Sequence, residues 1–131
     1  MLIKGLDSGR WDGCKNLAGF SQSDITSLEF KDKIFDCSIC LRLMHRIPLE
    51  IKEKAIKELK RVTSDYLIIS TGILRNSIST WITGKKSKNV RMKIDEWESF
   101  ISQYGTIERH IFVSKIFSNE IISIIGYSGL K

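Results

Sequence analysis

The strongest constraint on the fold of this chain is an amphipathic helical pattern that lies between two short strand-like runs. Phe35–Cys40 and residues 66–71 have the pattern of strands, the second apolar enough to be buried. Between them, after Pro48, apolar side chains recur at helical spacing with Lys and Glu on the opposite face; they are Ile51, Ala55, Leu59 and Val62. Proline is common at the first position of a helix. This succession of strand, helix and strand is typical of a layered α/β fold.

The second half of the chain predicts another helix and a terminal pair of strands. A further helical stripe ends before Gly105, which lies where a C-cap glycine belongs; its members are Ile94, Trp97, Ile101 and Tyr104. Residues 107–113 and 120–127 are β-rich, and Ser118-Asn119 suits the turn of an antiparallel hairpin. The sequence therefore predicts an α/β sheet with an antiparallel edge.

Two segments are less regular. Residues 17–22 form a short extended candidate, and residues 73–83 a helical one. No repeat, low-complexity tract or linker divides the 131 residues, and a chain of this length is about one domain. We therefore expect a single domain over residues 1–131.

The charge of the chain bears on its partners. Twenty-one Lys and Arg oppose 15 Asp and Glu, a net charge of +6, which permits an anionic partner but also suits an ordinary soluble surface. The basic run at residues 84–93 lacks interleaved aromatic residues, so nucleic-acid binding is not favoured. No apolar stretch approaches the roughly 20 residues that span a bilayer, and the first residues do not have the pattern of a secretory signal. We expect a cytoplasmic protein without a membrane partner.

Three cysteines raise the question of metal or redox chemistry. Cys37 and Cys40 form a Cys-x-x-Cys pair, whereas Cys14 stands apart. In a strand, residues i and i+3 point to opposite faces, so these two thiols would not chelate one ion. No second pair lies elsewhere in the sequence. We expect reduced thiols and no metal site.

Short segments along the chain resemble one enzyme family in their order and spacing. They are Ser23-Asp24-Ile25, Leu28-Glu29-Phe30, Ile34-Phe35-Asp36, residues 41–48, residues 55–62, residues 66–71, Asp95-Glu96-Trp97 and Tyr104-Gly105. Together they are similar to class I S-adenosylmethionine-dependent methyltransferases over about residues 14–127. The resemblance implies a three-layer Rossmann-like sheet in the strand order 3-2-1-4-5-7-6. In that order Phe35–Cys40 is the fourth strand and residues 66–71 the fifth.

The same resemblance suggests where S-adenosylmethionine would bind. Asp24 and Ile25 match the acidic loop after the third strand, which holds the adenine through a carboxylate and a backbone N–H. A carboxylate suits this task because it only accepts hydrogen bonds, although Asp24 also suits a turn or helix cap. At the carboxyl end of the fourth strand, where open α/β sheets place ligands, the matching residues are Cys40, Leu41, Arg42 and His45. His45 matches a frequent family histidine, and a structural role is the simpler interpretation for it.

The sequence departs from the family in one large respect. The glycine-rich turn after the first strand and the acidic residue that holds the ribose are both missing. Leu6-Asp7-Ser8-Gly9 matches the turn only superficially, because Gly9 and Asp24 lie only 15 positions apart, which leaves no room for the helices and strands that belong there. We therefore expect a methyltransferase-like sheet that is incomplete at its N-terminal side and binds the cofactor weakly or not at all.

Two hypotheses for the function follow, together with one for assembly. The chain takes part in methyl transfer to an unidentified acceptor, as a methyltransferase or as a fragment or split part of one. Alternatively it is a non-catalytic relic that serves as a binding or dimerisation module. Without a first strand beside it, Phe35–Cys40 would present an apolar unpaired edge. Either residues 17–22 move beside it or a second chain pairs with it, and we favour a homodimer through Phe35–Cys40.

Overall fold

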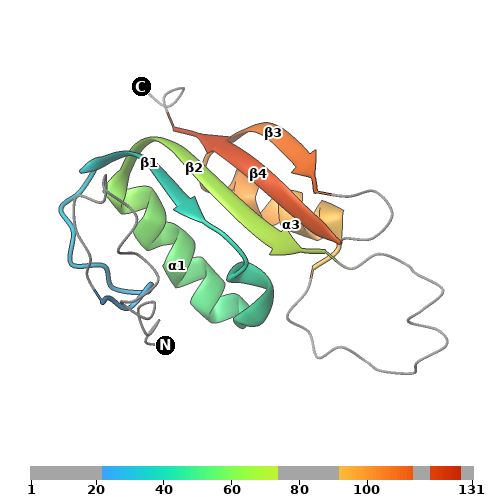
Figure 1. Cartoon of the computed structure of the whole chain (residues 1–131), viewed down its shortest axis with the longest axis horizontal. Coiled ribbons are helices and arrows are strands. Elements are labelled where there is room, and N and C mark those ends of the chain that lie inside the picture. The colour runs from blue at the N-terminus through green and yellow to red at the C-terminus, as the bar shows by residue number, and fades with distance from the viewer. Residues whose placement is uncertain (1–21, 74–91, 114–118, 128–131) are drawn as a thin grey trace, which may run out of the picture.

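The computed structural model describes residues 22–73, 92–113 and 119–127. Its elements in chain order are β1 (Phe35–Cys40), the 3₁₀ helix η2 (Met44–Arg46), α1 (Leu49–Val62), β2 (Thr63–Gly72), α3 (Ile94–Ser102), β3 (Thr106–Phe112) and β4 (Glu120–Gly126). The strands form one sheet in the order β1-β2-β4-β3 (Figure 1). The pair β1 and β2 is parallel, and the other two pairs are antiparallel. This α/β architecture and the terminal antiparallel pair confirm the predicted fold class.

One face of the sheet carries the core of the molecule. Cross-strand partners share a face, and Leu67 pairs with Ile125 while Ile69 pairs with Ser123. All four of these side chains are fully buried. Leu67, Ile69 and Ile125 pack in one cluster with residues of both α-helices, among them Ile56 of α1. The two α-helices of the described residues thus pack on the same face of the sheet as one helical layer.

Polar groups within this core tie α3 to the strands. Trp97 is fully buried and donates its indole N–H to Ser123 Oγ at 3.0 Å. His110 Nδ1 of β3 lies 2.9 Å from the same hydroxyl, and His110 Nε2 lies 3.3 Å from a carboxylate oxygen of Glu98. The buried Ser123 hydroxyl therefore has partners on both α3 and β3, so it does not remain an unsatisfied polar group.

The structure shifts some boundaries of the predicted elements. Pro48 is the N-cap of α1 rather than its first helical residue. β2 begins three residues before the predicted strand, because Thr63 Oγ1 donates to the Leu59 carbonyl at 2.6 Å and also bonds Ser38 Oγ. Ile73 was predicted to begin a helix, but it forms an isolated parallel bridge with Met92. Most of residues 17–22, 73–83 and 84–93 lies outside the described residues, so these predictions remain predictions.

Gly105 also has a different role from the one predicted. α3 ends at Ser102 with Gln103 as its C-cap, so Gly105 is not the cap. A Cβ at position 105 would lie 2.6 Å from Ile125 Cγ2 and 2.8 Å from Tyr127 Cε1. The position requires glycine because the chain passes so closely over β4. Neither of the two described α-helices is long and apolar enough to cross a membrane.

We predict that Gly105→Ala lowers the free energy of unfolding by about 1–3 kcal/mol, as expected for overpacking against a buried side chain. Gly126→Ala is the matched control, since its Cβ would meet the flexible, exposed side chain of Glu108 at 2.6 Å. That carboxylate moves away at a cost within about 0.5 kcal/mol. Urea unfolding of both variants measures the difference, and equal losses would contradict the packing argument.

Candidate ligand-binding site

Three polar side chains meet at the carboxyl ends of the parallel strands. Arg42 follows β1, Ser70 lies near the end of β2, and Glu120 begins β4. The Arg42 backbone N–H donates to Ser70 Oγ at 2.8 Å, and that hydroxyl donates to Glu120 Oε1 at 2.8 Å. The Arg42 guanidinium lies 3.5 Å from Glu120 Oε2. Open α/β sheets bind ligands at this edge, so we take these residues as the centre of the candidate site.

The backbone at Arg42 is held in an uncommon conformation. Its φ of 60° lies in the left-handed region, which costs a non-glycine residue on the order of 1 kcal/mol. The hydrogen bond to Ser70 fixes this turn and directs the chain away from the sheet toward η2. The Arg42 side chain is 67% exposed, so most of its N–H donors face solvent beside the Glu120 carboxylate. Such a group suits a carboxylate or phosphate on a ligand.

The other predicted residues near β1 have different surroundings. Cys40 is buried in the core, and this burial raises the pKa of its thiol to about 11. Leu41 is exposed, and His45 is half-buried in η2. Cys37 is exposed while Cys40 is buried, as expected for side chains on opposite faces of a strand. The described residues contain no group of three His, Cys, Asp or Glu side chains arranged to hold a metal ion.

The predicted adenine loop forms a tight turn. Asp24 Oδ1 accepts hydrogen bonds from the Thr26 N–H at 2.9 Å and from Thr26 Oγ1 at 2.8 Å, and the Asp24 carbonyl accepts from the Ser27 N–H at 3.0 Å. The backbone bond to Thr26 and its hydroxyl hold the pKa of Asp24 below its usual value. Ile25 turns inward and joins the same core cluster as Cys40. The turn-capping role of Asp24 is thus observed, and it leaves the carboxylate ionised at neutral pH.

A single arginine of α1 fastens this loop to the rest of the fold. The Arg61 guanidinium donates to the carbonyl oxygens of Leu28 and Phe30, each at 2.8 Å, and to Asp32 Oδ1 at 2.7 Å. It also donates to both carboxylate oxygens of Glu58, at 2.8 and 3.0 Å. Glu58 Oε2 in turn accepts the Leu28 N–H at 2.9 Å. These contacts define what we call the Arg61 clamp.

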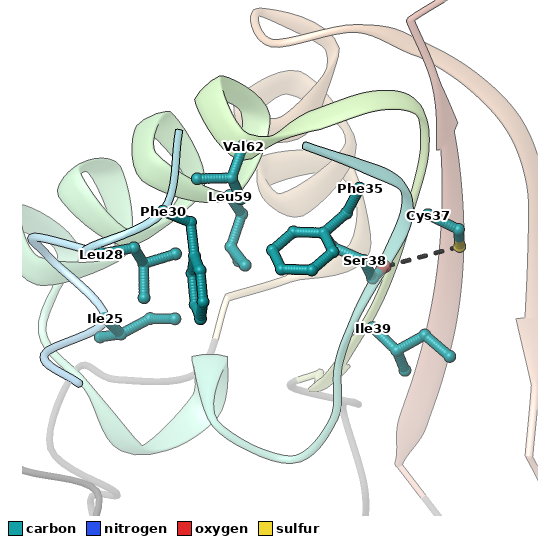
Figure 2. Close-up of a pocket in the computed structure, with 9 residues that line it drawn as sticks. All are labelled: Ile25, Leu28, Phe30, Phe35, Cys37, Ser38, Ile39, Leu59 and Val62. Carbon is teal, nitrogen blue, oxygen red and sulfur yellow. Dashed lines mark hydrogen bonds between the residues drawn. The ribbon is translucent and has the colours of Figure 1, made fainter. Parts of the chain in front are cut away.

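An apolar pocket lies between the loop, β1 and α1 (Figure 2). Its volume is about 270 Å³. The lining side chains are almost all apolar: Ile25, Leu28, Phe30, Phe35, Cys37, Ser38, Ile39, Leu59 and Val62. In Figure 2 the rings of Phe30, from the loop, and Phe35, from β1, meet edge to face, with centroids 5.0 Å apart. The pocket therefore borders the outer side of β1 rather than the polar cluster at Arg42.

Sequence reasoning selected Arg42 but missed Ser70 and Glu120. The two lie 50 residues apart, and no local motif connects them. Only the register of β2 and β4, in which Thr71 pairs with Ile121, brings them together. In the sequence, the only indication that Ser70 has a functional role was its polar side chain near the end of the apolar run at residues 66–71.

Sheet order and ligand edge define a Rossmann-like α/β fold, and comparison with known proteins shows which proteins the chain resembles. Residues 8–66 match the family described as Methyltransferase domain. This match covers less than half of the chain and shows a similarity to methyltransferases over residues 8–66. A comparison of the sequence with curated proteins found no significant match.

Solved structures agree with this fold. Magnesium protoporphyrin IX methyltransferase from Synechocystis PCC 6803 with bound S-adenosylhomocysteine is similar with a TM-score of 0.64 and 21% identity, over 79% of this chain and 48% of that one. A protein from Pyrococcus horikoshii OT3 is similar with a TM-score of 0.62 and 17% identity, over 79% of this chain and 57% of that one. A methyltransferase from Thermotoga maritima is similar with a TM-score of 0.55 and 19% identity, over 78% of this chain and 60% of that one. The chain spans about half to three-fifths of the length of these structures.

We predict that the Arg61 clamp keeps the adenine loop ordered. Arg61→Lys replaces a planar fork by one ammonium group, so amide exchange over residues 28–33 should accelerate about tenfold or more while α1 remains protected. Arg109→Lys, at an exposed position of β3, is the matched control. Unchanged exchange in Arg61→Lys would contradict the clamp.

The clamp also has a defined pH dependence. Hydrogen bonding to Arg61 holds the pKa of Glu58 below its ordinary 4.5. A lowered folded-state pKa gives stability that is present above the unfolded value and lost as the pH falls through the folded one. Protection of residues 28–33 should therefore persist at pH 5 and decline below pH 4.5, and Glu58→Gln should remove that pH dependence.

A further prediction concerns the thiols, measured in a Cys14→Ser variant at pH 8. Burial raises the pKa of Cys40 to about 11 from 9.0, so its thiolate is about a hundredfold scarcer than that of an ordinary cysteine. Iodoacetamide should modify the exposed Cys37 at least about fiftyfold faster than Cys40, and both equally in urea. The raised pKa of Cys40 in the folded state also bears on stability. The uncharged buried thiol contributes to the stability of the fold below pH 9, and this contribution is lost as the pH rises from 9 to about 11. Equal rates in the folded protein would contradict the burial of Cys40.

Proposed function

We propose that this chain takes part in S-adenosylmethionine-dependent methyl transfer to an acceptor that the sequence does not identify. The observation that carries the proposal is the strand order. A parallel pair followed by two antiparallel partners, β1-β2-β4-β3, corresponds to strands 4-5-7-6 of the family order. Since the chain spans only part of its structural neighbours, the activity of a whole methyltransferase is part of this proposal.

The residues of the loop suit the adenine end of the cofactor. An ionised Asp24 carboxylate accepts hydrogen bonds and matches an exocyclic amine, and the neighbouring Ile25 lines an apolar pocket. S-adenosylmethionine, when bound, supplies an activated methyl group on a sulfonium. The protein then mainly aligns the acceptor with that group and excludes water. Arg42 and Glu120, beside each other at the ligand edge, are the groups we assign to orienting the acceptor.

Binding by the chain alone should be weak. The glycine-rich turn and the ribose carboxylate, which the sequence lacks, account for several hydrogen bonds of roughly 1–3 kcal/mol each in this kind of site. The alternative function, a non-catalytic binding or dimerisation module, is favoured by the apolar surface beside β1. Cofactor titration separates the two functions.

We predict that millimolar S-adenosylhomocysteine, titrated into the ¹⁵N-labelled chain, shifts the amide signals of residues 24–26 and 40–45. Asp24→Ala should abolish the shifts at the loop and weaken binding far more than His45→Ala. Asp95→Ala, an exposed carboxylate in the first turn of α3, is the matched control and should leave binding unchanged.

Each other outcome counts against a stated part of the proposal. No shift at millimolar ligand would reject the adenine-loop assignment and leave the non-catalytic alternative. Micromolar affinity would refute the expectation of weak binding. A larger loss in His45→Ala than in Asp24→Ala would show that the assigned loop does not hold the adenine.

A further inference from the structure

The sheet of the described residues has two outer edges of opposite character. β1 pairs there only with β2, and β3 only with β4. The middle of β3 carries three titratable side chains in succession, from Glu108 to His110, and such charges discourage pairing with another chain. β1 carries one charge, Asp36. Its outer backbone groups are therefore the ones that another strand could join.

Large apolar side chains gather beside this edge. Half of the ten exposed large hydrophobic residues of the described part lie between positions 30 and 41: Phe30, Ile34, Phe35, Ile39 and Leu41. Their exposed fractions run from 37% to 64%. Three of them, Phe30, Phe35 and Ile39, also line the apolar pocket (Figure 2). Exposed apolar surface concentrated in this way marks an interaction site.

We propose that a second copy of this chain pairs antiparallel with β1, so that the two sheets join across a two-fold axis. Antiparallel pairing of one edge with itself is the arrangement that such an axis produces, and it closes the assembly at two copies. The backbone N–H and C=O groups of both edges then find partners, and the apolar side chains beside them become buried together.

The charges near the edge are compatible with this symmetry. Asp36 lies at one end of β1, so antiparallel pairing keeps the two Asp36 carboxylates at opposite ends of the interface. Arg42 lies two residues beyond the other end and is 67% exposed. With the two-fold axis at Ile39, each Asp36 approaches the end of the second copy's β1 that Arg42 follows. Opposite charges meet there and like charges do not.

The available area is also on the scale that a dimer needs. The exposed parts of the five apolar side chains amount to on the order of 400 Å² per protomer, comparable to the largest patch of a typical monomer. A standard interface buries about 800 Å² per partner. In the proposed dimer the remainder would come from the backbone of the paired strands and the loop that carries Phe30.

Sedimentation of the full chain at low micromolar concentration tests the proposal, and we expect a dimer. Ile39→Lys places a charge in the proposed interface at a side chain that is 64% exposed, so the protomer should keep its circular dichroism while the dimer dissociates at least tenfold more readily. Ile111→Lys is the matched control, because Ile111 is exposed on β3 at the opposite edge. This variant should remain dimeric.

A monomeric wild-type chain would overturn the proposal, as would an Ile39→Lys variant that dimerises like the wild type. Amide exchange of residues 35–40 in the wild type gives a second measurement that needs no variant. The dimer predicts slower exchange as the protein concentration rises. Exchange that is slow but independent of concentration would instead indicate that residues of the same chain, such as residues 17–22, cover the edge. Cofactor titration and sedimentation are separate measurements, so the dimer and the methyl-transfer proposal can fail separately.

Discussion

The arrangement of the molecule depends on the pairing of β2 along both of its edges. This strand holds β1 in a parallel register on one side, with Cys37 opposite Tyr66, and β4 in an antiparallel register on the other. Its alternate side chains Leu67 and Ile69 are fully buried under the helices. Since the side-chain period of a strand is two, a slip of one residue would turn this apolar set away from the core. The register is therefore fixed by burial, and it also determines which residues meet at the ligand edge.

Local patterns predicted the elements whose stability is local. The stripe that contains Ala55 and Leu59 buries one face of α1, and the terminal β-rich runs pair as expected. The boundary before β2 was wrong because Thr63 is polar and its partners, the Leu59 carbonyl and Ser38 Oγ, are visible only in the folded chain. The prediction that Gly105 is the C-cap of α3 was wrong for a similar reason. A side chain at position 105 is excluded by Ile125, which lies 20 residues later in the sequence.

The site was predictable only in part, and the division has a physical basis. Arg42 follows a recognisable strand, so its position at the ligand edge could be inferred from the order of elements. Its partners Ser70 and Glu120 depend on the long-range register of β2 and β4. The Arg61 clamp is likewise non-local, because one guanidinium joins α1 to a loop some 30 residues earlier. Networks of this kind position a loop precisely without leaving a periodic signal in the sequence.

β1 connects the two proposals, because one strand contributes its carboxyl end to the ligand site and its outer edge to the dimer. In the family order stated above, the place beside this edge belongs to strand one, which carries the glycine-rich turn. A second copy on β1 would occupy the same place, so the symmetric dimer and a complete cofactor site exclude one another on a given protomer. Binding equilibria that exclude each other are linked reciprocally. Any polypeptide that supplied strand one would have to displace the second copy. Its free energy of binding would then be reduced by the free energy that the dimer contributes.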